Sequence, residues 1–189
     1  MKMFLLILFL QVFLPLRAQS LEEKVLIDRY LNGSPTLEKL SEIENILRRN
    51  NKLEHIPLFH PLKGLGRISS GYGMRNHPIT KKKIFHSGVD LAVDVGTGVY
   101  AAASGTVIFA GRKGGYGRCI IISHKYGYET IYAHLIAYYT KEGNIVRQGD
   151  IIGFVGSTGR STGNHLHYGV KNKGKSVRPY LNISLWNKK

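Results

Sequence analysis

The chain has a single cysteine, Cys119, among its 189 residues. One thiol excludes an intrachain disulfide and any zinc motif that is built on several cysteines. Its neighbours in residues 118–122 are mostly isoleucines, so we expect a buried thiol within a strand. Cysteine chemistry is thereby ruled out as the framework of the fold.

Acidic residues are also scarce: the chain has 12 Asp and Glu but 27 Lys and Arg. Its formal net charge is therefore +15. Such a charge attracts polyanions. No nucleic-acid-binding motif is present, and the export argued below would keep the protein away from nucleic acid. We therefore expect no nucleic-acid partner and favour an anionic polymer of the cell envelope.

Long apolar runs are missing except at the N-terminus. Lys2 precedes an apolar stretch over residues 3–16, and Ala18 offers a small residue for cleavage, which predicts a signal peptide over residues 1–18. The stretch is shorter than the ~20 residues of a spanning helix, and the alternative is an uncleaved membrane anchor. No cysteine follows it, which argues against a lipoprotein. We expect export, to the periplasm or the cell surface, with no other membrane segment.

The segment after this leader predicts helices. Residues 20–23 have the spacing of a capping box, and Ser34-Pro35 would start a second helix after the break at residues 32–33. Apolar side chains then recur on one helical face: Leu37, Leu40, Ile43 and Leu47. We interpret residues 19–64 as a helical extension that packs on the main domain, with a linker and an inhibitory segment as alternatives.

Glycine, in contrast, is abundant from residue 65 onward, and the chain has 22 in all. Short runs of Val, Ile and Tyr alternate there with glycine-containing turns, which is typical of an antiparallel β domain. We predict one such domain over residues 65–189, within the usual 100 to 200 residues.

Two histidine-containing strands in this domain carry polar side chains opposite an apolar face. In Val89-Asp90-Leu91 the apolar residues share one parity, so Asp90 points away from the core, and His86 has the same parity as Asp90. A straight strand would separate the two by about 13 Å, so a metal site needs a bend at Ser87-Gly88. An ordinary hydrogen-bonded pair is the alternative. In His165-Leu166-His167 both imidazoles lie on the non-core face. Three interpretations of this pair stay open: ligands of a catalytic metal, a closed structural site, or a pair on the surface.

A third strand adds one more histidine. In residues 131–135 alternation would place Ile131, Ala133 and Leu135 in the core, with Tyr132 and His134 on the opposite face. A lone histidine so placed is usually structural, but three strands agree here. Imidazoles and a carboxylate suit a divalent, borderline-soft cation, so we expect one zinc site. The His-Glu-x-x-His, Gly-x-Ser-x-Gly and Walker motifs are absent.

Taken together, these motifs resemble the lysostaphin-type (LytM-like) zinc metallopeptidases. The resemblance rests on His-x-x-x-Asp at 86–90, Tyr-Ala-His-Leu at 132–135 and His-x-His at 165–167. Further matches at residues 70–75, 77–78, 98–102 and 156–163 support it, and it extends from about residue 68 to 182. It implies a mainly β fold in which an antiparallel sheet forms a groove. This domain type is described as a duplicated hybrid motif and is similar to a barrel-sandwich. Here the short helical segment precedes it.

The resemblance also implies roles for the five residues. His86, Asp90 and His167 would hold one Zn2+ with water in the fourth position, and His134 and His165 would flank that water and the substrate carbonyl. Which histidine acts as the base stays open. The implied activity is hydrolysis of peptide bonds in peptidoglycan, in stem-peptide crosslinks or interpeptide bridges.

Two other functions compete with this reading. Some relatives have lost zinc ligands and activate other wall hydrolases, but this sequence keeps all five positions. The hairpin-like residues 147–153 resemble a lipoyl or biotinyl carrier, but the Met-Lys-Met attachment turn is missing and the histidines would be unexplained. We therefore reject a carrier and keep the regulator as the alternative.

Overall fold

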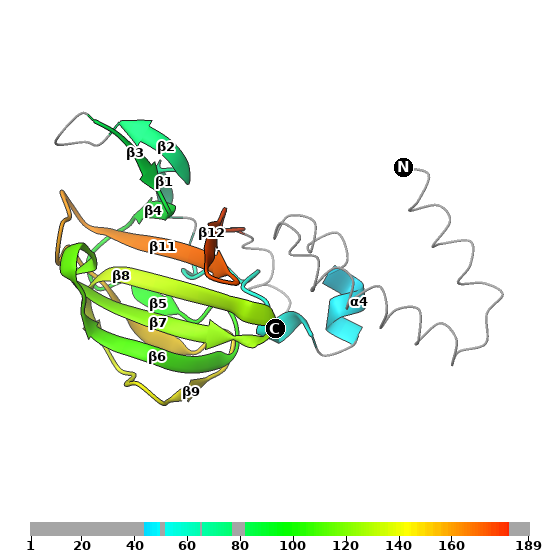
Figure 1. Cartoon of the computed structure of the whole chain (residues 1–189). Coiled ribbons are helices and arrows are strands. Elements are labelled where there is room, and N and C mark those ends of the chain that lie inside the picture. Colours follow the sequence, from blue (N-terminus) through cyan, green and yellow to red (C-terminus); the bar gives the residue numbers. More distant parts are fainter. Residues whose placement is uncertain (1–43, 50–51, 65, 77–81, 182–189) are drawn as a thin grey trace, which may run out of the picture.

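The computed structural model describes residues 44–49, 52–64, 66–76 and 82–181 (Figure 1). The predicted signal peptide over residues 1–18 and the predicted helical residues up to 43 lie outside the described residues. Within them, none of the helices combines the length and the apolar character that a membrane crossing requires.

The body is a large antiparallel sheet, as the turn-rich sequence predicts (Figure 1). Its main path runs in the order β1 (Arg67–Ser70), β4 (Gly88–Ala92), β11 (His165–Asn172), β8 (Tyr128–Tyr138), β7 (Arg118–His124), β6 (Gly105–Arg112) and β9 (Ile145–Val146). Off this path, β10 (Ile151–Val155) pairs with β8 and with β5 (Gly98–Tyr100), and β12 (Lys175–Val177) pairs with β11.

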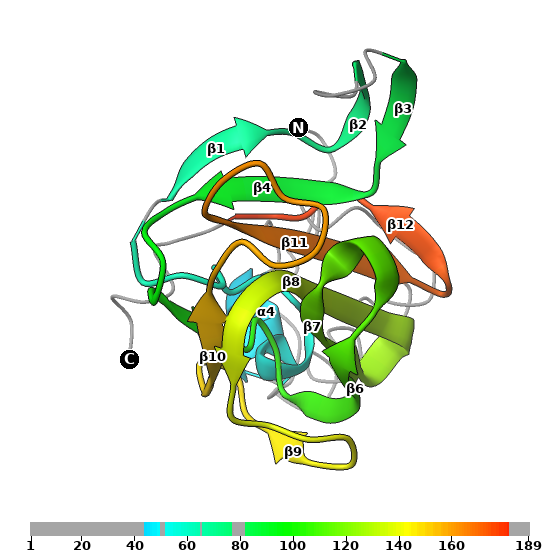
Figure 2. The same ribbon diagram turned by 90° about the vertical axis from the view of Figure 1, so that its left-hand side faces the viewer.

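A separate hairpin stands off the large sheet beside β1 and β4 (Figure 2). It consists of β2 (Gly73–Asn76) and β3 (Lys83–His86), which pair antiparallel with Gly73 opposite His86. The short helical elements are α4 (Glu44–Arg49), η1 (Leu53–His55), η2 (Gly114–Tyr116) and η3 (Lys125–Gly127).

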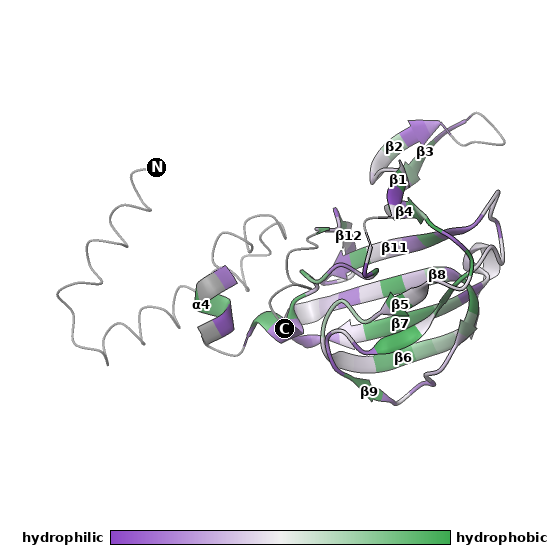
Figure 3. Cartoon of the chain, turned by 180° about the vertical axis from the view of Figure 1, so that it is seen from behind, coloured by the Kyte–Doolittle hydropathy of each residue, from purple (hydrophilic) through white to green (hydrophobic). Residues whose placement is uncertain are grey.

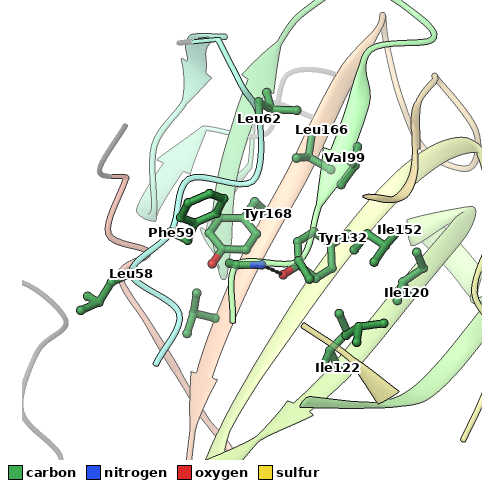
Figure 4. Close-up of a cluster of buried hydrophobic side chains, with 14 of the residues drawn as sticks. Leu58, Phe59, Leu62, Val99, Ile120, Ile122, Tyr132, Ile152, Leu166 and Tyr168 are labelled. Carbon is green, nitrogen blue, oxygen red and sulfur yellow. Dashed lines mark hydrogen bonds between the residues drawn. The ribbon is translucent and has the colours of Figure 1, made fainter. Parts of the chain in front are cut away.

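The main core lies on one face of the large sheet, where strands β5 and β10 and the segment around η1 cover it. Three fully buried tyrosines, Tyr128, Tyr132 and Tyr168, lie in it beside Leu166. Figure 4 shows aliphatic side chains of β5, β7 and β10 packed around Tyr132. Figure 3 shows hydrophobic stretches along β6 and β7, in contrast to a hydrophilic β2.

The last part of the predicted extension belongs to this core. Leu47 of α4 is fully buried, and five apolar side chains follow it into the same cluster: Leu53, Ile56, Leu58, Phe59 and Leu62. The Tyr100 amide of β5 donates to the Pro61 carbonyl at 2.9 Å. The packing predicted for the extension is thus present over its described part, while the division at residues 64 and 65 stays a prediction.

Several local predictions from the sequence are confirmed. Cys119 is buried in β7, and the apolar residues of β4 and β11 face the core. Among the turn glycines, Gly117 and Gly159 have φ values of 63° and 76°, which favour glycine.

One prediction is wrong: Tyr132 does not share a face with His134. Tyr132 is fully buried in the main core and accepts a hydrogen bond from the Ala102 amide at 2.8 Å (Figure 4). Ile131 and Ala133 instead pack with Cys119 in a smaller cluster. The alternation fails because the pairing register of β8 shifts near His134, whose φ is 63°.

Candidate metal centre

The first two candidate ligands meet at the corner between β3 and β4. His86 ends β3 in the hairpin and Asp90 lies in β4 of the large sheet, so the chain turns at Ser87-Gly88. The turn brings Nε2 of His86 to 3.2 Å from Oδ1 of Asp90, whereas a straight strand would keep their Cα atoms about 13 Å apart. Nδ1 of His86 donates to the Gly71 carbonyl at 2.8 Å, which leaves the lone pair of Nε2 directed at the site.

The third candidate ligand comes from the neighbouring strand. The antiparallel register places His167 of β11 directly opposite Asp90, with Nδ1 of His167 2.9 Å from Oδ1 of Asp90. Gly88 permits this approach, because a Cβ there would lie 2.5 Å from the Tyr168 carbonyl oxygen and 2.8 Å from the His167 ring. Side chains from two strands and a corner therefore converge on one point.

The geometry of these three residues fits a zinc ion. Their ligand atoms lie 2.9, 3.1 and 3.2 Å apart, and tetrahedral bonds of about 2.1 Å place ligand atoms about 3.4 Å apart. His86, Asp90 and His167 are the group of candidate metal ligands found among the described residues, and all three are buried. The donor set of two imidazoles and a carboxylate is typical of catalytic zinc sites.

The protonation states also suit a cation. Burial raises the pKa of the Asp90 carboxyl, but the close His167 and His86 rings outweigh it and hold that pKa well below its usual range. Burial lowers the pKa of His167, opposed in part by Asp90. Asp90 is therefore ionised and His167 neutral at neutral pH, which are the metal-binding forms.

Two more imidazoles lie beside these ligands. The rings of His134 and His165 are 4.6 Å apart, and the His134 ring is 6.0 Å from that of His167. Nδ1 of His134 donates to the Thr158 carbonyl at 2.7 Å, and Nδ1 of His165 lies 2.8 Å from the Gly163 carbonyl. Each Nε2 is thus left to act as an acceptor. Burial lowers the pKa of His134 to about 4, so its imidazole is neutral at pH 7.

His134 occupies an uncommon backbone conformation. Its φ of 63° lies in the left-handed region that residues other than glycine seldom adopt. The shift in the register of β8 accompanies it, and the strand turns its side chain towards His165 instead of continuing the alternation. Such local strain is commonly found at functional sites.

The five residues line a cavity of about 470 Å³ that is open to solvent. The hairpin residues Ile84 and Phe85 form part of one wall. The loop with Tyr116 and the loop before β11, residues 156–164, contribute other parts; Figure 2 shows these two loops next to each other. The histidines therefore line a cavity that solvent reaches from outside.

The structure adds three residues to this cavity that the sequence did not single out as site residues. Arg75 places Nη2 3.5 Å from Oδ2 of Asp90, and the ring of Tyr116 lies 5.5 Å from that of His167. Arg160 lines the cavity from the loop before β11. The signals were present, since Arg75 ends the 70–75 run and Tyr116 interrupts a glycine cluster, but only the fold brings them to the histidines.

An antiparallel sheet that brings three buried candidate metal ligands and two further imidazoles into one open cavity fits the class of metallohydrolases. The model of Peptidase family M23 matches residues 84–179, about half of the chain and all five candidate residues. The chain belongs to Peptidase family M23. The predicted lysostaphin-type family is thereby confirmed.

Similar proteins agree with this assignment. The DD-carboxypeptidase/endopeptidase Mpg of Neisseria meningitidis is 55% identical over 113 residues, which are 60% of this chain and 26% of that protein. A solved zinc-containing peptidase from Vibrio cholerae is 34% identical with a TM-score of 0.61, over 65% of this chain and 39% of that one. The catalytic domain of lysostaphin from Staphylococcus simulans is 34% identical with a TM-score of 0.52, over 62% of this chain and 84% of that one. The chain spans about a quarter of the length of the curated relatives it matches.

Proposed function

We propose that this chain is a zinc metalloendopeptidase that hydrolyses peptide bonds in bacterial peptidoglycan, in stem-peptide crosslinks or interpeptide bridges. The observation that carries the proposal is the convergence of His86, Asp90 and His167 beside the imidazoles of His134 and His165. The similarity to a DD-carboxypeptidase/endopeptidase supports the endopeptidase activity. The similarity to the peptidoglycan DD-endopeptidase ShyA of Vibrio cholerae supports the substrate class.

In this proposal three side chains hold one Zn2+. His86 binds it through Nε2, His167 through Nδ1, and Asp90 through a carboxylate oxygen. When bound there, zinc lowers the pKa of water towards ~7 and polarises a carbonyl group. The Gly71 carbonyl fixes the ring of His86, and Arg75 supports the second oxygen of Asp90. Such supporting contacts orient ligands and raise metal affinity.

His134 and His165 carry the protons in this proposal. Both rings are fixed through Nδ1 by backbone carbonyls, so the Nε2 atoms are the proton-transfer positions. One imidazole accepts the proton of the attacking water as its oxygen bonds to the carbonyl carbon. An imidazolium then gives a proton to the nitrogen that leaves when the C–N bond breaks. The remaining imidazole steadies the developing oxyanion once its Nε2 carries a proton and can donate a hydrogen bond.

The proposed site of action is outside the cytoplasmic membrane, where peptidoglycan lies. The signal-like residues 1–18 and the net charge of +15 support this location, because the wall polymer carries carboxylates. The non-catalytic regulator has no observation in its favour, since all five positions of the hydrolytic site are present.

Digestion of purified peptidoglycan tests the proposal. The zinc-loaded chain should release peptide fragments with new amino and carboxyl ends, detected by mass spectrometry, which also identifies the bond. Pretreatment with a zinc chelator should abolish the release, and His167→Ala should be inactive. Release of the same fragments by His167→Ala, or none by the zinc-loaded chain, would overturn the proposal.

A further inference from the structure

Arg160 has a fixed place on the wall of the metal-containing cavity. It lies in the loop before β11, and its backbone amide donates to the Gly115 carbonyl at 2.9 Å. A Cβ on Gly115 would lie 2.8 Å from Nε of Arg160, so the guanidinium end packs directly against that glycine. A glycine at position 115 therefore admits the arginine to this place.

The two loops that meet at this contact are locked together. A Cβ on Gly159 would lie 2.3 Å from the amide nitrogen of Gly117, so the two backbones touch. Thr158 Oγ1 accepts a hydrogen bond from the Arg118 amide and donates one to the Leu135 carbonyl, both at 2.9 Å. The loop is thus held in position without a ligand, which lowers the entropic cost of binding.

The charge of Arg160 is not used within the described part of the chain. The two arginines that line the cavity are Arg75 and Arg160. Arg75 has partners, because it faces Asp90 and donates to Ser70 Oγ at 2.7 Å. No ion pair involves Arg160 among the described residues, and Asp90 is the one carboxylate among the residues that line the cavity. An exposed guanidinium is always charged and presents a fork that matches a carboxylate in bidentate fashion.

The position of Arg160 relates it to the reacting atoms. The next residue, Ser161, has its Oγ 3.2 Å from Nδ1 of His165. On the other side, Gly115 precedes Tyr116, whose ring lies 5.5 Å from that of His167. A group bound by Arg160 therefore lies in the same cavity as His165 and His167, beside the centre of the site.

We propose that Arg160 is a specificity-determining residue that binds a free carboxylate of the substrate on a residue flanking the scissile amide. The substrate class is thus an acidic peptide with one unamidated carboxyl group next to the cleaved bond. This inference rests on the proposed peptidase function and deepens it.

The test uses two synthetic peptides built on the bond that the peptidoglycan digest identifies. They differ only at the flanking residue, which carries a free carboxylate in one and a carboxamide in the other. The zinc-loaded chain should favour the acid by about 10- to 100-fold in kcat/KM, the range for a charged bidentate contact. In Arg160→Gln that ratio should fall towards 1, and Arg160→Lys should keep a part of it.

Arg147→Gln is the matched control, because Arg147 is an exposed arginine outside this cavity, and its ratio should equal that of the wild type. Equal zinc content and circular dichroism would show that Arg160→Gln is folded. If both peptides are cleaved with a ratio near 1, or the ratio persists in Arg160→Gln, the inference is overturned and the peptidase function stands. If the zinc-loaded chain cleaves neither peptide, both the inference about Arg160 and the proposed peptidase function are overturned.

Discussion

At the scale of single residues, the site depends on backbone carbonyls that fix three imidazole rings. Gly71, Thr158 and Gly163 provide the acceptors for Nδ1 of His86, His134 and His165. The sequence pointed to the histidines themselves through their side of each strand. It could not reveal the acceptors, because any residue type can supply a carbonyl and only the fold determines which one lies within reach.

The division of roles among the histidines gives the first prediction. His167→Ala should lose both bound zinc and activity, because it removes one of three ligands. His134→Ala and His165→Ala should keep about one zinc per chain and lose at least ~100-fold in turnover. Metal analysis of the purified variants, together with their hydrolysis rates, checks this. Loss of zinc in His134→Ala or His165→Ala would show that the ligand assignment is wrong.

His124 gives a second prediction, for stability. It is buried in β7, where Nε2 lies 2.7 Å from Thr130 Oγ1, and burial lowers its pKa from 6.5 to about 4. The unfolded chain therefore binds a proton at higher pH than the folded chain, so stability is full above pH 6.5 and falls towards pH 4. Lowering the pH from 7 to 4.5 should therefore reduce the free energy of unfolding by about 2–3 kcal/mol through His124.

Urea unfolding of the wild type and His124→Gln at both pH values measures this effect. The glutamine variant should be less stable at pH 7 but lose less stability on acidification. An equal loss in both proteins would contradict the assignment of this pH dependence to His124.

At the scale of secondary-structure elements, alternation in the sequence was sufficient where strands are regular. The faces of β4 and β11 follow the simple pattern, which directs Asp90, His165 and His167 away from the core. The pattern failed in β8, where the irregularity at His134 changes the side on which neighbouring residues lie. Periodicity assumes an unbroken pleat, so a strained residue at a functional position defeats it.

The contact between β4 and β11 leads to a third prediction. A methyl group at Gly88 would collide with the Tyr168 carbonyl and the His167 ring. Gly88→Ala should therefore destabilise the fold by about 1–3 kcal/mol and weaken zinc binding at least ~10-fold. Gly64→Ala is the control, because a Cβ there meets nothing within 4 Å. Zinc titration and urea unfolding of both variants make the comparison, and wild-type zinc affinity in Gly88→Ala would contradict it.

At the scale of the whole molecule, the segment before β1 is part of the body that carries the site. Helical periodicity predicted that the extension packs on the domain, and the buried Leu47 agrees. The sequence did not show how closely residues 53–62 join the core, because they lack a clear period. Their apolar side chains contact strands from distant parts of the chain, which single-sequence patterns do not reveal.

Phe59 provides the fourth prediction, since it is 1% exposed against the sheet (Figure 4). Phe59→Ala should lower the free energy of unfolding by about 3–5 kcal/mol. Ile145→Ala, at a side chain that is 84% exposed, should change it by less than about 0.5 kcal/mol. Urea unfolding of both variants at pH 7 decides. Equal stabilities would mean that the extension is dispensable for the fold.

The central claim is that His86, Asp90 and His167 hold one zinc ion on which peptide hydrolysis depends. The most direct measurement adds zinc back to the metal-free chain and follows peptidoglycan fragment release against equivalents of zinc. We predict that activity rises to a plateau at one equivalent and that His167→Ala stays inactive throughout. Full activity of the metal-free chain, or a plateau reached by His167→Ala at the same equivalence, would contradict the claim.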